Sequence, residues 1–143
     1  MTRIILVRHG HVEGISPERF RGRRDVDLSE LGARQARGTA QRIAQQWRPL
    51  IVYTSPLRRC LQTAEAIAAA CGISAAIRDD LTDLHYGDWE WRTHEEVRAQ
   101  CLDQPLSAYW RLAQDPCALS EIEISDHGTT VHRVNETHHL FET

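Results

Sequence analysis

The apolar run from Ile4 to Val7 constrains the fold of this chain more than any other stretch. Three of its four residues are β-branched and no polar residue alternates with them, a pattern typical of a strand buried on both faces of a sheet. The run ends at Arg8, His9 and Gly10. In open α/β sheets ligands bind at the carboxyl ends of the strands, so we expect a site there. A histidine can supply a nucleophile or a base, and an arginine can hold an anion.

The length and charge of the chain indicate one globular domain. Its 143 residues suffice for one hydrophobic core, and we expect residues 1–143 to form a single domain that ends in a hairpin and tail over residues 120–143. The formal net charge of −3 is not that of a general nucleic-acid-binding surface. All 17 basic residues are arginine, which excludes lysine as a Schiff-base or P-loop residue.

Neither a signal peptide nor a membrane-spanning segment is expected from the sequence. The chain opens on a short strand, and no apolar run approaches the length of a transmembrane helix. Its four cysteines form no Cys-x-x-Cys pair and do not indicate a disulfide framework. The cytoplasm is the simplest compartment for such a chain, and we expect no membrane partner.

Helical and strand patterns alternate over the first half of the chain. Apolar residues at helical spacing predict one helix that Ser29 caps and a second that Ser55 caps and Gly72 ends. Short apolar runs predict strands at residues 50–53 and 74–78. This alternation is typical of an α/β fold, and we predict three layers with helices on both faces of a mostly parallel sheet.

The predicted topology places Arg8, His9 and Arg58 at one edge of the sheet. Arg58 falls in the first turn of the second helix, where backbone N–H groups and the helix dipole favour an anion. These groups together predict a phosphate pocket. The loop before the first helix adds four arginines within six residues, at positions 19, 21, 23 and 24. They form either a solvated surface or the mouth of the same site.

The second half of the chain has weaker patterns. Thr93 and Glu96 are spaced as a capping box for a helix that extends to about Cys101, and residues 106–113 predict a further amphipathic helix. Alternating residues on either side of Asp126-His127-Gly128 predict a terminal hairpin.

Four motifs occur in order over the first two thirds of the sequence. They are Leu6-Val7-Arg8-His9-Gly10, Gly22-Arg23-Arg24-Asp25-Val26-Asp27-Leu28-Ser29-Glu30-Leu31-Gly32, Ser55-Pro56-Leu57-Arg58-Arg59-Cys60-Leu61-Gln62-Thr63-Ala64, and the stretch from Leu81 to Thr93. In this order they resemble the histidine phosphatase superfamily, also called phosphoglycerate-mutase-like. The resemblance implies that family's α/β fold.

The resemblance also implies a metal-independent phosphatase that forms a phosphohistidine at His9. Arg8 and Arg58 would bind the phosphate of a small phosphorylated metabolite, because guanidinium groups stabilise the charge of the transferring phosphoryl group without a cofactor. Asp83 matches the family's acid, whose place is just before a Tyr-Gly or Leu-Gly pair, and would donate a proton to the leaving oxygen.

The acid role of Asp83 requires a raised pKa. We expect the neighbouring rings of Tyr86 and Trp89 to raise it by desolvation. Two alternatives are a plain turn residue at Asp83 and a proton donor at His85.

The chain departs from the family pattern in two places. Val12 and Ile15 stand where the family often has a hydroxyl residue and an asparagine, so two polar contacts to the phosphate would be missing. After Trp91 the sequence lacks the apolar strand that precedes the family's second active-site histidine. His127 either serves as that histidine or, as we favour, lies at the hairpin tip of a shortened second half. A missing strand exposes the edges of its neighbours, so we expect a homodimer.

Phosphomonoester hydrolysis is the favoured function. A phosphoglycerate-mutase-type transfer is less favoured because a short chain has little room to shield the phosphohistidine from water. A weakened relative that only binds phosphorylated ligands is a further alternative, as is nucleic-acid binding by the arginine-rich loop. A metal site at His132, His138 and His139 has irregular spacing and is the least favoured.

Overall fold

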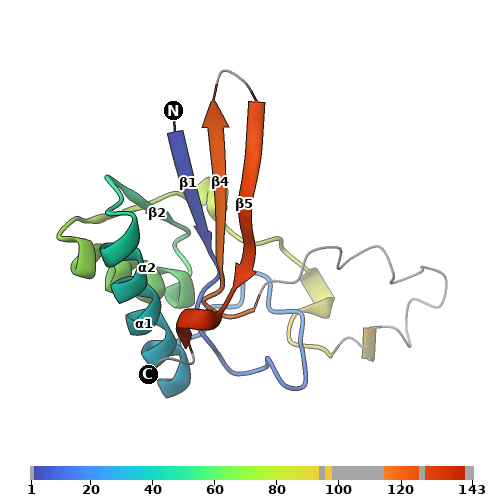
Figure 1. Ribbon diagram of the computed structural model, residues 1–143. Helices are drawn as coiled ribbons and strands as arrows, with labels where there is room; N and C mark the ends of the chain where they lie inside the picture. The colour runs from blue at the N-terminus through green and yellow to red at the C-terminus, as the bar shows by residue number, and fades with distance from the viewer. Residues whose placement is uncertain (1, 94–95, 98–114, 126–127, 141–143) are drawn as a thin grey trace.

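The computed structural model describes residues 2–93, 96–97, 115–125 and 128–140 (Figure 1). Its main elements are β1 (Thr2–Val7), α1 (Glu30–Gln46), β2 (Val52–Thr54), α2 (Arg58–Cys71), β3 (Ala75–Ile77), β4 (Leu119–Ser125) and β5 (Gly128–Glu136). Short 3-10 helices lie at Asp79–Leu81, Gly87–Trp89 and His138–Leu140. The order of helices and strands predicted for the first half of the chain is confirmed.

The strands form two sheets that differ in direction. β1, β4 and β5 make an antiparallel sheet in the order β1-β4-β5, in which Thr2 pairs with Ile124 and Val7 with Leu119. β2 and β3 make a parallel pair. The α/β class is confirmed, and the predicted parallel order is found between β2 and β3. For β1 that prediction is wrong, because the returning strand β4 pairs with it antiparallel.

The core lies between the helices and the antiparallel sheet. Ala40 and Ile43 of α1, Ile67 of α2 and Leu119 of β4 form its buried centre, against which Ile5 packs from β1. Both described α-helices lie together on one side of this sheet rather than on its two faces (Figure 1). The buried core residues of α1 and α2 are among the apolar residues that recur at helical spacing in the sequence. That periodicity therefore identified the faces of the two helices that pack in the core.

The strand β1 is buried on one face only. Ile5 packs against the core, whereas Ile4 and Leu6 are 39% and 44% exposed. The expected burial on both faces is therefore wrong for the described residues.

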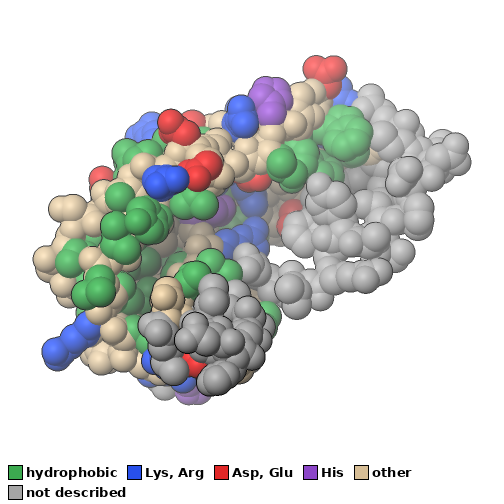
Figure 2. Space-filling view, turned by 90° about the horizontal axis from the view of Figure 1, so that it is seen from above, with side chains coloured by type: hydrophobic (Ala, Val, Ile, Leu, Met, Phe, Trp, Pro, Cys, Tyr) green, Lys and Arg blue, Asp and Glu red, His purple; other side chains and the backbone are tan. Residues whose placement is uncertain are grey.

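Hydrophobic side chains reach the surface over much of the face shown in Figure 2. Among the described strands, β1 pairs only with β4 and β2 only with β3, and the homodimer stays a prediction.

The two helices begin in different ways. Ser29 caps α1 as predicted, since its Oγ accepts a hydrogen bond from the backbone N–H of Gly32 at 3.1 Å. The predicted cap of α2 at Ser55 is wrong, because the helix begins at Arg58 and its N-cap residue, Leu57, makes no side-chain cap. Instead the backbone N–H of Arg58 donates to Oδ1 of Asp25, a residue of the loop before α1, at 2.7 Å.

Two predictions for the later part of the chain are confirmed. The capping box is present, since the backbone N–H of Thr93 donates to Glu96 at 2.7 Å and that of Glu96 to Thr93 Oγ1 at 3.1 Å. The terminal hairpin is formed by β4 and β5, with Ser125 opposite Gly128. His127 and the helix predicted over residues 106–113 lie outside the described residues. No helix in the described part of the chain is long and apolar enough to cross a membrane.

Two glycines let the loop after β1 lie directly on the start of α1. A Cβ atom built on Gly10 would lie 2.5 Å from the carbonyl oxygen of Gly32. A Cβ atom on Gly32 would in turn overlap the backbone of His11. Because both obstacles are backbone atoms, neither can rotate away, and the position of His9 depends on this close contact.

We expect Gly10→Ala to destabilise the fold by about 1–3 kcal/mol, because the added methyl group must push two backbone segments apart. The matched control is Gly38→Ala in α1, where the nearest atom to a built Cβ is 3.9 Å away. This control should raise stability by about 1 kcal/mol through helix propensity. Urea unfolding of both variants measures the difference, and equal stability of the two would contradict the contact.

Candidate active site

His9 lies directly after β1, at the carboxyl end of the strand, with one ring nitrogen fixed by the backbone. Its Nδ1 donates a hydrogen bond to the carbonyl oxygen of Gly10 at 2.7 Å. A carbonyl oxygen only accepts, so Nδ1 carries the proton of the neutral ring and Nε2 keeps its lone pair. Nε2 is therefore the nitrogen that can act as a nucleophile or a base.

The surroundings of His9 keep its imidazole neutral. Burial lowers the pKa of His9 from 6.5 to about 3, and the hydrogen bond to Gly10 opposes this effect. The positive charges of Arg59, Arg8 and Arg21 lower the pKa further. These three arginines place a positive field around an uncharged imidazole, which is an arrangement that suits an anionic ligand.

Arg59 is the buried arginine of the site. Its side chain is 1% exposed, and its guanidinium donates to the carbonyl oxygens of Gly22 and Arg24, each at 2.9 Å. The same group forms an ion pair with Oδ2 of Asp83 at 3.3 Å. Its Nε is buried and has no hydrogen-bond partner among the described residues.

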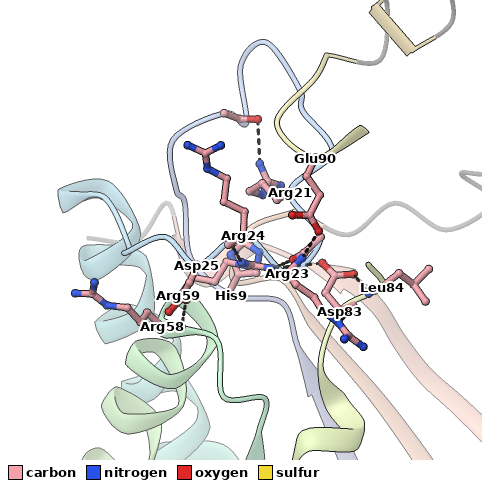
Figure 3. A network of polar contacts seen from close by, with 12 residues as sticks. His9, Arg21, Arg23, Arg24, Asp25, Arg58, Arg59, Asp83, Leu84 and Glu90 are labelled. Atoms are coloured by element: carbon pink, nitrogen blue, oxygen red, sulfur yellow. Dashed lines mark hydrogen bonds and ion pairs between the residues drawn. The ribbon is translucent and has the colours of Figure 1, made fainter. Parts of the chain in front are cut away.

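Arg58, the arginine predicted to bind phosphate, is not brought to His9. Its Nη2 lies 2.8 Å from Oδ1 of Asp27, its side chain is 60% exposed, and Figure 3 shows it extending away from the other labelled residues. Successive residues of an α-helix point about 100° apart, and here Arg59 lies on the buried side of α2 while Arg58 is exposed. The helix N-terminus is also occupied, because Asp25 accepts the N–H of Arg58. The predicted pocket at the start of α2 is therefore wrong in these two details.

Asp83, the predicted acid, lies beside the buried Arg59. Its Oδ1 accepts the backbone N–H of Leu84 at 2.8 Å, and its side chain is 43% exposed. The rings of Tyr86 and Trp89 pack on Phe20, with centroids 5.1 and 6.0 Å away. These contacts place both rings on Phe20, and the desolvation of the carboxylate by the two rings stays a prediction.

Two residues that the sequence analysis quoted without a role tie the site loops to α2. The backbone N–H of Gly10 donates to Oγ1 of Thr63 at 3.2 Å. Gln62 accepts the N–H of Leu28 and donates to Asp27, both at 2.8 Å. Thr63 lies four residues after Arg59, on the same buried face of α2, and this spacing could have identified Thr63.

The backbone N–H of Cys117, just before β4, also binds the loop that contains His9. It donates to the carbonyl oxygens of Arg8 and His9 at 3.1 and 3.3 Å. The loop after β1 is thus held by backbone contacts from the C-terminal part of the chain as well as from α1 and α2.

A histidine at a strand end, buried guanidinium groups and a nearby carboxylate make up a candidate anion-binding site. The family description that matches residues 4–104 is the histidine phosphatase superfamily, branch 1. The chain belongs to this superfamily, as its motifs suggested.

Three related proteins illustrate the likeness. A glucosyl-3-phosphoglycerate phosphatase of Mycolicibacterium vanbaalenii is 40% identical over 111 residues, which cover 78% of this chain and 48% of the relative. A metal-independent phosphoserine phosphatase of Arabidopsis thaliana is 39% identical over 88 residues, 61% of this chain and 37% of the relative. The solved structure of a mycobacterial glucosyl-3-phosphoglycerate phosphatase with VO3 matches this chain with a TM-score of 0.83 at 18% identity. The match covers 96% of this chain and 100% of the solved chain.

These likenesses differ in what they establish. The solved structure confirms the phosphoglycerate-mutase-like fold. The chain spans about half the length of the Mycolicibacterium vanbaalenii relative and less of the Arabidopsis thaliana one. Activity and substrate are therefore matters for a proposal about this chain.

We expect His9 to stay neutral, with the proton on Nδ1, from pH 8 down to about pH 4, because its pKa lies near 3. Nitrogen-15 NMR of the imidazole rings checks this directly, with the exposed His85 as the internal comparison. Between pH 6.5 and 3 the unfolded chain binds a proton that the folded chain does not. Acid should therefore lower the free energy of unfolding by up to about 1.4 kcal/mol per pH unit in that window. A His9 ring that titrates near pH 6.5 would contradict this.

Proposed function

We propose that this chain hydrolyses a phosphomonoester through a phosphohistidine formed on Nε2 of His9. The observation that carries the proposal is the neutral imidazole of His9, which keeps a lone pair on Nε2 within the field of Arg59 and Arg8. The two curated relatives support the reaction class, because both are phosphatases by name. The substrate class is a small phosphorylated metabolite.

The proposed reaction has two steps. Nε2 of His9 attacks the phosphorus atom while the bond to the leaving oxygen breaks, and protonated Asp83 gives its proton to that oxygen. Water then attacks the phosphohistidine, Asp83 takes the proton of the water, and the electron pair of the P–N bond returns to Nε2. Inorganic phosphate leaves, and both residues regain their starting states.

Arg8 and Arg59 are the proposed ligands of the phosphoryl group. Arg59 takes the place that the sequence analysis gave to Arg58, because its guanidinium lies buried beside Asp83 while that of Arg58 faces Asp27. Guanidinium groups held in advance stabilise the charge on the equatorial oxygens of the transition state. Catalysis in this proposal needs no metal ion, since positioning and charge come from the side chains.

Rapid mixing of the chain with a phosphorus-32-labelled phosphoryl donor, quenched in alkali, should trap a label that is stable to base and lost in acid. His9→Ala should abolish the label because the attacking nitrogen is gone. Absence of labelling in the folded wild-type chain would contradict the phosphohistidine, and would favour a relative that binds phosphorylated ligands without turning them over.

A matched pair of arginine variants tests the assignment of the phosphate ligand. Arg59→Gln should lower kcat/KM by about a hundredfold or more, because a charge-assisted contact to the transition state is lost. Arg58→Gln should change kcat/KM by less than about threefold, since its exposed ion pair contributes little. Steady-state kinetics with para-nitrophenyl phosphate measures both, and the reverse order would return the role to Arg58.

A further inference from the structure

The last described helix contains a buried histidine that the proposed reaction does not use. After β5 the chain forms the 3-10 helix His138–Leu140, which lies beside α1 (Figure 1). His139 in this helix is 6% exposed, whereas His138 is exposed. An unpaired polar group in the interior costs free energy, so the ring of His139 has to face polar partners. These partners indicate what the ring does.

His139 and Thr39 share one backbone acceptor. Nε2 of His139 lies 3.0 Å from Oγ1 of Thr39 and 3.2 Å from the carbonyl oxygen of Cys117. The hydroxyl of Thr39, buried in α1, donates to the same carbonyl oxygen at 3.3 Å. Because that hydroxyl gives its proton to Cys117, its contact with His139 needs a proton on Nε2. His139 is therefore a hydrogen-bond donor to both Thr39 and the carbonyl oxygen of Cys117.

Cys117 uses both polar groups of its backbone at this point. Its carbonyl oxygen accepts from Thr39 and His139, whereas its N–H donates to the carbonyl oxygens of Arg8 and His9. The residue is 0% exposed, and its φ of 58° lies in the left-handed region that residues with a side chain rarely adopt. Such a conformation persists only where the surrounding contacts impose it. The two donors to its carbonyl oxygen are contacts of this kind.

Asn135, near the end of β5, binds the same segment two residues earlier. Its Oδ1 accepts the backbone N–H of Asp115 at 2.6 Å, and its Nδ2 donates to the carboxylate of Asp115 at 2.9 Å. The segment that enters β4 is therefore attached at two points to the chain around the end of β5. Of these two points Cys117 is the one that contacts the loop of His9.

We propose that His139 is a positioning residue for His9 and acts through Cys117. The carbonyl groups of Arg8 and His9 belong to the two peptide bonds on either side of the His9 Cα atom, and the N–H of Cys117 binds both. The donors to the carbonyl oxygen of Cys117 keep that N–H aimed at them. The direction in which the imidazole leaves the backbone is thereby fixed. This inference rests on the proposed function, because it takes His9 as the attacking group.

Kinetics of His139 variants with para-nitrophenyl phosphate measure this role. His139→Ala should lower kcat by about tenfold to a hundredfold, because a misplacement of about 1 Å at an attacking group can cost that much. KM should stay within about threefold, since Arg59 binds from α2 and does not depend on this contact. His139→Gln should restore most of kcat, because its amide nitrogen can reach the position of Nε2. The matched control is His138→Ala, which removes an exposed imidazole and should change kcat by less than about twofold.

A readout on His9 itself separates positioning from a purely structural role. In folded His139→Ala the pKa of His9 should rise from about 3 toward 6.5, because the ring is no longer held in its buried position. Nitrogen-15 NMR of the imidazole measures this change, and hydrogen exchange of the Cys117 amide should become faster. A folded His139→Ala chain whose His9 keeps the pKa of the wild-type chain would overturn the inference, whatever its stability.

The outcomes separate this inference from the proposed function. A pKa of His9 that rises in His139→Ala, in a chain that never forms phosphohistidine, would support the positioning role and overturn the hydrolysis. If His139→Ala does not fold, His139→Asn replaces it, because an asparagine amide is too short to reach the carbonyl oxygen of Cys117. His139→Asn should then raise the pKa of His9, and His139→Gln should not. A Cys117 amide that exchanges as fast as an exposed amide in the wild-type chain would overturn the inference without any variant.

Discussion

The buried guanidinium of Arg59 is the group on which the site depends. It contacts two carbonyl groups of the loop before α1 and the carboxylate of Asp83, so one side chain of α2 joins segments that are distant in sequence. A guanidinium at 1% exposure needs such partners, because an uncompensated buried charge is costly. The contacts with Arg59 therefore fix the positions of the loop and of Asp83, and the charge of the same guanidinium acts on His9.

Much of the site could be predicted from the sequence, and the main error has a simple physical cause. The position of Arg8 and His9 just after β1 was predicted because chain direction alone fixes the end of a strand. Asp83 was found only through the family resemblance. Arg58 was predicted as a phosphate ligand because the first turn of a helix favours anions. Helical spacing favours Arg59, since Arg59, Thr63 and Ile67 share the buried face of α2.

The fold was predicted well where it depends on local pattern and less well where it depends on distant pairing. Caps and periodicity identified α1 and the terminal hairpin, whose signals lie within a few residues. The pairing of β1 with β4, in which Ile4 lies opposite Ile122, joins the two ends of the chain, and no local signal specifies it. The burial of β1 on one face only depends on that arrangement. The apolar run shows from sequence that both faces are hydrophobic, but which face is covered depends on the elements that pack against the strand.

The two hydrogen bonds from the amide of Cys117 constrain how the second half of the chain can be connected to the site. They attach the segment that enters β4 to the carbonyl groups of Arg8 and His9, so His9 is held by both ends of the sequence. A protein of this type can gain or lose residues between Thr93 and Cys117 only if the chain still returns to those two carbonyl groups.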